Sequence, residues 1–274
     1  MSATPIDGQQ QWARADSHIH LFGREQLDTP GLIQDDVLRY NGLMAEHRLK
    51  LALIVGPPPS SFPGNNEFVA EIAGEFDWLR PLAALRVREL TVKRLEQLAE
   101  GPFLGVSIYT AWAKLEDGRS ESAALPEVPA AVWAWLVRRR WFVSVNDVCL
   151  SRSAESGWAA WLEVVKAHPE LRLLISHLGL PAPAPPDTPM GTAHWTVAEC
   201  RERIADVLAF AAFPGPRVKL SGFYALTSPS HDYPHKPSWG YVEALLEAFT
   251  ASRLLWCATH TLIASSVVSP SIQT

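Results

Sequence analysis

Two short apolar runs and a helical segment between them make up residues 142–177, FVSVNDVCLSRSAESGWAAWLEVVKAHPELRLLISH. The runs at 142–146 and 171–177 are short and rich in Val, Leu and Ile, which is typical of buried strands. Residues 158–168 have apolar side chains at helical spacing. A strand, a helix and a second strand in this order predict a βαβ unit with parallel strands.

The same unit repeats along the chain. Eight apolar runs lie at residues 15–22, 51–55, 82–85, 103–108, 142–146, 171–177, 218–221 and 254–256, and helical segments lie between them at 33–47, 66–76, 91–99, 129–140, 158–168, 197–210 and 241–249. Eight such units in 274 residues predict one domain, residues 1–274, of the α/β class with a (β/α)8 barrel fold. A doubly wound open sheet is the alternative, but no glycine-rich phosphate loop follows the first run.

Composition describes an ordinary globular protein, with 47% hydrophobic residues, 19% charged residues and a net charge of −5. The basic trio at residues 138–140 ends a helical segment, where cations stabilise the helix dipole, so nucleic-acid binding is not expected. Three distant cysteines fit a reducing compartment. No run reaches the length of a membrane span, and the N-terminus lacks the apolar core of a signal peptide. We predict a cytoplasmic protein that acts on a small molecule, without a membrane partner, and a homo-oligomer stays open.

The run at residues 15–22, ADSHIHLF, contains His18 and His20. Because side chains alternate along a strand, both imidazoles share one face, about 7 Å apart along the strand. Such a pair can bind a metal or polarise a carbonyl group, and Asp16 adds an acceptor that could orient a ring nitrogen. The structural alternative is two polar side chains on an edge strand, or a hydrogen-bonded core histidine.

A barrel gathers the carboxyl ends of its strands at one mouth, where active sites form. His177 ends an otherwise apolar run, and we predict that it joins the first-strand pair there. Two long loops, residues 181–189 and 227–239, belong to the same side, and the second can cover the mouth or form an ordinary polar turn. Other polar residues at predicted strand ends or in the second loop are Arg86, Ser107, Asn146, Lys219, Ser221, His231, Tyr233 and His235.

Four segments together resemble the amidohydrolase superfamily, and within it the branch of sugar lactonases and dicarboxylate pyrone lactonases, with decarboxylases more distant. They are DSHIHLF at 16–22, ISHLGLP at 175–181, VKLSG at 218–222 and RLLW at 253–256. The resemblance implies a (β/α)8 barrel in which His18 and His20 bind a divalent metal or polarise the carbonyl directly. It also implies that His177 assists as a metal ligand, electrophile or acid/base.

The chain departs from the family pattern at two places. Metal-binding members often have a fifth-strand histidine where this chain has Asn146, which predicts that a zinc-like ion is held weakly. The eighth strand of the family usually ends Trp-Gly-Ser-Asp, and that aspartate activates water. Here residues 256–260 read WCATH, no Asp or Glu follows Glu247, and no room remains for the usual last helix, so we expect that helix to be altered or missing. His260 is the nearby group able to replace the aspartate.

The leading hypothesis is a hydrolase that opens a lactone, or cleaves an amide or ester, of a small carboxylated or sugar-like substrate. The three histidines would stabilise the oxyanion, and His260 would accept the proton of the attacking water. We predict that the substrate is held by Arg86, Asn146, Lys219, Tyr233 and His235. A catalytically impaired barrel and a metal-dependent decarboxylase are the alternatives.

Overall fold

Eight parallel strands form one sheet in the order β1 to β8, with each strand pairing with the next along the chain. The computed structural model describes residues 14–23, 36–110, 115, 118–147, 157–181, 195–226 and 234–257. The strands are β1 (Arg14–Ile19), β2 (Leu49–Val55), β3 (Leu79–Ala84), β4 (Gly105–Tyr109), β5 (Phe142–Asn146), β6 (Arg172–Ile175), β7 (Arg217–Leu220) and β8 (Leu254–Trp256). The predicted α/β fold class is confirmed, because these strands form a nearly closed (β/α)8 barrel.

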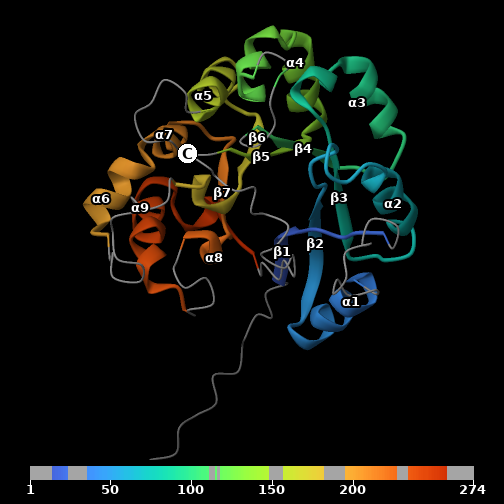
Figure 1. Cartoon of the computed structure of the whole chain (residues 1–274), viewed down its shortest axis with the longest axis horizontal. Helices are drawn as coiled ribbons and strands as arrows, with labels where there is room; N and C mark the ends of the chain where they lie inside the picture. Colours follow the sequence, from blue (N-terminus) through green and yellow to red (C-terminus); the bar gives the residue numbers. More distant parts are fainter. Residues whose placement is uncertain are drawn as a thin grey trace, which may run out of the picture.

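Helices follow one another around the outside of the strands (Figure 1). The α-helices are α1 (Asp36–Glu46), α2 (Asn65–Ile72), α3 (Val92–Ala99), α4 (Ala130–Arg139), α5 (Gly157–Ala167), α6 (Val197–Arg203), α7 (Ala205–Leu208), α8 (Phe223–Leu226) and α9 (Trp239–Phe249). The 3-10 helices are η2 (Val87–Glu89), η3 (Glu121–Glu127), η4 (His177–Gly179), η5 (Ala209–Ala212), η6 (Lys236–Ser238) and η7 (Ala251–Arg253). None of the helices in the described part of the chain is long and apolar enough to cross a membrane.

The apolar core lies between the outer faces of the strands and the surrounding helices. Trp158, Trp161, Phe210 and Phe249 are fully buried there, and the rings of Trp158 and Phe210 meet edge to face at 5.9 Å. Large aromatic side chains contribute strongly to such a core because each removes a large apolar area from water. Trp158 and Trp161 are therefore packing residues.

The interior of the barrel is unusually polar. On β5, Val143 and Val145 belong to the apolar core under the helices, so the alternating Ser144 faces the interior. Its Oγ lies 3.4 Å from Ser176 Oγ, and Ser107 Oγ donates to the carbonyl of Gly56 at 2.6 Å. Branched apolar residues usually fill this space. These hydroxyl groups are hydrogen-bonding partners for the buried charged and polar side chains at the mouth.

Two predicted elements are shorter than expected. The predicted strand at 171–177 ends at Ile175, because φ is positive at His177, Leu178 and Leu180 and the chain turns back over the barrel in η4. The predicted helix at 197–210 is interrupted at Ile204, where φ is −111° and ψ is 22°.

The first and last strands meet through a side chain. Ser17 Oγ on β1 donates to the carbonyl of Trp256 on β8 at 3.0 Å. Within the described residues, no backbone ladder joins β1 to β8. The predicted change in the last helix falls on residues 258–274, which lie outside the described part of the chain.

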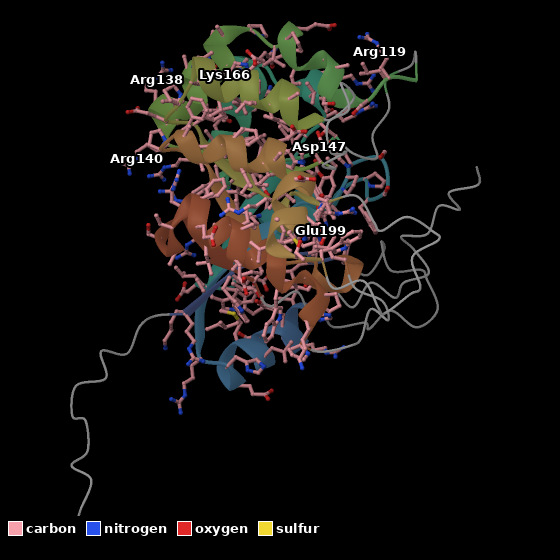
Figure 2. The ribbon with its side chains drawn as sticks, turned by 90° about the vertical axis from the view of Figure 1, so that its left-hand side faces the viewer. Arg119, Arg138, Arg140, Asp147, Lys166 and Glu199 are labelled. Carbon is pink, nitrogen blue, oxygen red and sulfur yellow. The ribbon has the colours of Figure 1, made fainter. Side chains whose placement is uncertain are left out.

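The basic residues at the end of α4 and the carboxylate after β5 lie at opposite ends of the barrel. Figure 2 shows Arg138 and Arg140 on the opposite side of the ribbon from Asp147, which follows β5 directly. The carboxyl end of β5 therefore faces the mouth, and the basic trio at residues 138–140 lies at the far end.

Candidate active site

The predicted pair of histidines comes together at the end of β1. His18 is buried, and His20 follows the strand directly and is half-buried. Their Nε2 atoms are 3.3 Å apart, and their rings meet edge to face with centroids 5.0 Å apart. Register shifts between Asp16 and Ile19 interrupt the pairing of β1 with β2 at this point. Such irregularities re-aim side chains.

His177 reaches the same place from the turn after β6. Its ring centroid lies 4.5 Å from that of His18. The backbone N–H of His177 donates to Ser221 Oγ at 3.2 Å, and its Nδ1 lies 2.9 Å from the same oxygen. The left-handed backbone of His177, with φ 54°, is sparsely populated for a residue with a side chain. The structure thus brings together the three histidines that the sequence singled out.

All three imidazoles are held in the neutral form at neutral pH. Burial is the largest cause, and it lowers the pKa of His20 to about 4 and that of His177 to about 3, and the pKa of His18 well below 6.5. The positive charge of Lys219 lowers each of these pKa values further. A neutral imidazole offers one N–H donor and one lone pair.

Lys219, on β7, lies inside the barrel next to His18. Its side chain is fully buried, donates to Ser144 Oγ at 2.8 Å and places Nζ 3.4 Å from His18 Nδ1. Burial lowers the pKa of this amine to about 8, and the nearby negative charge of Asp16 opposes that shift. Its predicted contact with substrate remains a prediction, because its described partners are protein groups.

Asp16 orients the backbone of the histidine strand. Its Oδ1 accepts from the backbone N–H of His18 at 3.0 Å, and its Oδ2 accepts from Tyr40 Oη at 2.9 Å. Neither of these two bonds goes to a ring nitrogen, so the orientation of an imidazole by Asp16 stays a prediction. Burial and the Asp16 charge raise the pKa of Tyr40, so its hydroxyl stays protonated and donates.

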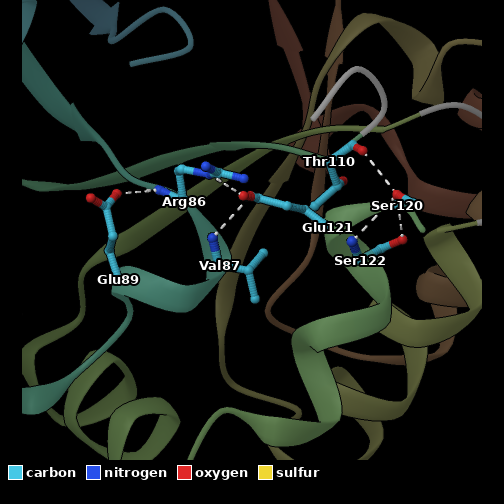
Figure 3. A network of polar contacts seen from close by, with 7 residues as sticks. All are labelled: Arg86, Val87, Glu89, Thr110, Ser120, Glu121 and Ser122. Atoms are coloured by element: carbon cyan, nitrogen blue, oxygen red, sulfur yellow. Dashed lines mark hydrogen bonds and ion pairs between the residues drawn. The ribbon is translucent and has the colours of Figure 1, made fainter. Parts of the chain in front are cut away.

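Arg86, a predicted substrate-binding residue, forms an ion pair with Glu121 (Figure 3). Glu121 is buried and also accepts from the backbone N–H of Val87 at 3.1 Å. Nearby, Ser120 Oγ donates to the carbonyl of Thr110 at 2.9 Å. The network ties the segment after β3 to the segment before α4. A substrate anion at Arg86 would have to share the guanidinium with Glu121, and that role stays a prediction.

Asn146 ends β5, two residues beyond Ser144 on the same face. Its side chain is buried, and its Oδ1 has no hydrogen-bond partner among the described residues. Buried polar atoms are nearly always paired, so this oxygen is available to a ligand or to water. The prediction that Asn146 binds substrate fits this geometry but stays untested.

The predicted loop residues are only partly visible. His235 has a left-handed backbone and stacks on Phe223 with ring centroids 6.1 Å apart and 13° between planes. Tyr233 and His231 lie outside the described residues. So do His260 and Thr259, the residue that takes the place of the family aspartate when Trp-Gly-Ser-Asp is set against residues 256–259.

Two residues at the site were not predicted. Tyr109 ends β4 and places its hydroxyl 3.5 Å from His20 Nε2; its place two residues after Ser107 on one strand was the available signal. Cys257 follows β8, is buried, and places Sγ 2.7 Å from Ser17 Oγ. Burial raises the pKa of this thiol to about 11, so it stays protonated. No pattern in the sequence separated it from a packing cysteine.

The histidines do not by themselves complete a metal site. His20 has the arrangement of a metal ligand, because its Nδ1 lies 2.6 Å from the carbonyl of Val55, the usual kind of second partner. Zinc in proteins takes three or four protein ligands. Among the described residues, however, no group of three His, Cys, Asp or Glu side chains is arranged to hold an ion.

Comparisons with known proteins agree with this fold. A family model described as amidohydrolase matches residues 60–257, a range that contains His177 and Lys219. No curated protein sequence matches the chain significantly.

Solved structures with the same fold are distant in sequence. An amidohydrolase from Burkholderia multivorans with bound zinc is 18% identical, with a TM-score of 0.64 over 90% of this chain and 84% of the other. A protein described as a 2-pyrone-4,6-dicarboxylic acid hydrolase from Pseudomonas putida is 19% identical, with a TM-score of 0.62 over 94% and 86%. A 2,6-dihydroxybenzoate decarboxylase from Rhizobium is 14% identical, with a TM-score of 0.56 over 89% and 87%. At these identities the likeness concerns the fold alone.

Proposed function

The chain belongs to the amidohydrolase family, and we propose that its three-histidine site activates the carbonyl group of a lactone towards water. An amide or ester of a similarly small, carboxylated or sugar-like substrate is the less favoured choice. One observation carries the proposal: the neutral rings of His18, His20 and His177 converge at the carboxyl ends of the strands. That end of a barrel is where active sites form.

Water attack on a carbonyl group moves negative charge onto its oxygen. Ring N–H groups held in place by the protein stabilise that charge without reorganising. The hydroxyl of Tyr109, 3.5 Å from His20 Nε2, is a further donor close to the same position. The Oδ1 of Asn146, which has no partner in the described part of the chain, could accept from a hydroxyl group of a sugar-like substrate. Donors for the oxyanion and an acceptor for the substrate thus come from different strands.

The attacking water must lose a proton, and a basic group near the three histidines has to accept it. Asp16 uses both oxygens for Tyr40 and for the backbone of His18, and its carboxylate is tied to that structural role. His177 is a weak base because burial lowers its pKa to about 3. The candidate that we propose is His260, which lies outside the described residues. If His260 does not accept the proton, the site lacks a base, because Thr259 stands in the place of the family aspartate.

We also propose that a divalent ion is held weakly. Elemental analysis after dialysis should find well under one equivalent. A full equivalent retained through chelator treatment would contradict this and indicate additional ligands, with His231 or His235 as the first candidates.

The test is turnover of a panel of sugar lactones and pyrone carboxylates by the purified chain. We expect slow hydrolysis by the wild type, and a rate roughly 10²-fold higher in Thr259→Asp if a general base alone is lacking. If His260 has taken that role, the wild type turns over briskly and His260→Ala is slow.

Other outcomes contradict the proposal in distinct ways. No hydrolysis by the wild type and by Thr259→Asp would indicate a catalytically impaired barrel. Release of carbon dioxide from a carboxylated substrate, dependent on added metal, would indicate a decarboxylase instead. Full activity in both variants would move the water-activating group elsewhere.

A further inference from the structure

A backbone carbonyl group shows which ring nitrogen of His20 carries the proton. His20 Nδ1 lies 2.6 Å from the carbonyl oxygen of Val55. A carbonyl oxygen only accepts, so the proton of the His20 ring is on Nδ1. A ring with its single proton on Nδ1 has a lone pair on Nε2, which is the acceptor that the neighbouring His18 nitrogen requires.

This assignment fixes the neighbouring histidine. His18 Nε2 lies 3.3 Å from His20 Nε2. Two lone pairs would repel at this distance, so His18 Nε2 carries the proton and donates it to His20. A neutral His18 then has its lone pair on Nδ1. That atom lies 3.4 Å from Lys219 Nζ, an ammonium group that can only donate.

Three hydrogen bonds therefore run in one direction, from Lys219 to His18, to His20 and to the carbonyl of Val55. We propose that Lys219 is a positioning residue that keeps His18 protonated at Nε2 and thereby withholds this histidine from a metal ion. The Nε2–H of His18, which bonds to His20 in this structure, would then be the donor that an oxyanion of a bound substrate takes over. That last clause rests on the proposed function, whereas the protonation of His18 and the exclusion of metal do not.

Lys219 is the wrong second partner for a metal ligand. A histidine that binds a metal through Nε2 must carry its proton on Nδ1 and usually donates it to a carbonyl or carboxylate. His20 meets this requirement through Val55, but Nδ1 of His18 faces a group with no lone pair. The buried positive charge of Lys219, with Ser144 Oγ as its other described partner, would also repel a cation nearby.

The experiment uses the full chain with 15N-labelled histidine, without metal or substrate, near neutral pH. Long-range 1H–15N correlations report which ring nitrogen carries the proton, and His18→Ala and His20→Ala assign the signals. We expect the proton on Nε2 of His18 and on Nδ1 of His20. A proton on Nδ1 of His18 would overturn the proposal.

Lys219→Met tests whether Lys219 determines which nitrogen of His18 carries the proton. His18 should lose its preference for Nε2–H, and the affinity for Zn²⁺ alone should rise roughly 10-fold, since second partners typically change metal affinity by about 10–100-fold. Lys166→Met is the control, because Lys166 is exposed and pairs with Glu163 at 2.6 Å. It should change neither the tautomer of His18 nor the affinity for Zn²⁺. An unchanged tautomer or an unchanged Zn²⁺ affinity in Lys219→Met would overturn the role of Lys219.

A second variant protects the test against misfolding. Lys219→Gln keeps a polar group whose amide oxygen can accept from Nδ1–H, and the same two changes are expected. If neither variant folds, Zn²⁺ affinity of the wild type and of His18→Ala decides: equal affinities support the proposal, and weaker binding by His18→Ala contradicts it. Both readouts are independent of turnover, so an absence of lactone hydrolysis would leave this inference standing.

Discussion

The ring of His177 lies directly against the backbone of Gly222. A Cβ atom added to Gly222 would lie 2.8 Å from Cβ, Cγ and Nδ1 of His177, closer than real Cβ contacts. Gly222 also has φ +71°, a conformation that L-residues rarely adopt. The place of His177 beside His18 therefore depends on the absence of a side chain after β7.

Gly222→Ala should displace the His177 ring and abolish any hydrolytic activity of the site, and it should also lower stability. The matched control is Gly118→Ala, because Gly118 has φ +83° but no atom within 4 Å of an added Cβ. Both variants bear a similar backbone cost of about 1–2 kcal/mol. Chemical denaturation and turnover separate the two effects, and equal loss of activity in both would show that the contact with His177 is unimportant.

The pH dependence of stability should reflect the buried histidines. Their folded pKa values are lowered, to about 4 for His20 and about 3 for His177, so the unfolded chain binds more protons between those values and about 6.5. Stability is then complete above about pH 6.5 and falls as the pH decreases towards 4. Each such histidine contributes about 1.4 kcal/mol per pH unit within this window.

Urea denaturation at a series of pH values in this range measures the effect. His177→Asn should show a weaker pH dependence than the wild type, because asparagine does not titrate and tolerates the left-handed backbone. His47→Gln replaces an exposed histidine and should keep the wild-type dependence. The same slope in both variants would mean that His177 is charged or accessible in the folded protein.

Asn146→Leu should leave stability unchanged or raise it by about 1 kcal/mol, because the lost Oδ1 has no described partner and its burial is costly. The same variant should weaken binding of substrates with hydroxyl groups. Ser107→Ala is the control, since it removes a bond of 2.6 Å to the buried carbonyl of Gly56 and should cost about 1–2 kcal/mol. Equal destabilisation by both would show that Asn146 is bonded within the protein.

Glu121→Gln should lower the free energy of unfolding by about 2 kcal/mol, less than the roughly 3–5 kcal/mol for fully buried pairs, because Arg86 is 24% exposed. Glu163→Gln, in an exposed pair with Lys166, should have almost no effect. If Glu121→Gln leaves stability intact and strengthens binding of an anionic substrate, Arg86 serves the substrate more than the fold.

The barrel and the three histidines were predictable because each depends on local patterns. Short apolar runs separated by helical segments specify parallel strands, and a histidine that ends an apolar run belongs at the mouth of a barrel. The partners of these residues were not predictable. Glu121 lies 35 positions from Arg86, and Lys219 lies 201 positions from His18, so only the closed barrel brings each pair together. Nor did any pattern reveal that His177 has a left-handed backbone.

The side-chain bond between Ser17 and Trp256 has a consequence for local unfolding. β1 carries His18 and has a backbone ladder on one side only among the described residues, so this strand can separate from the barrel by breaking a single ladder. Its amide protons should exchange with solvent faster than those of β4 and β5, which are paired on both sides. A ligand that contacts both His18 and His177 would tie β1 to the turn after β6. Such a ligand would protect the amides of β1 far more than those elsewhere, and hydrogen exchange would detect its binding even without turnover.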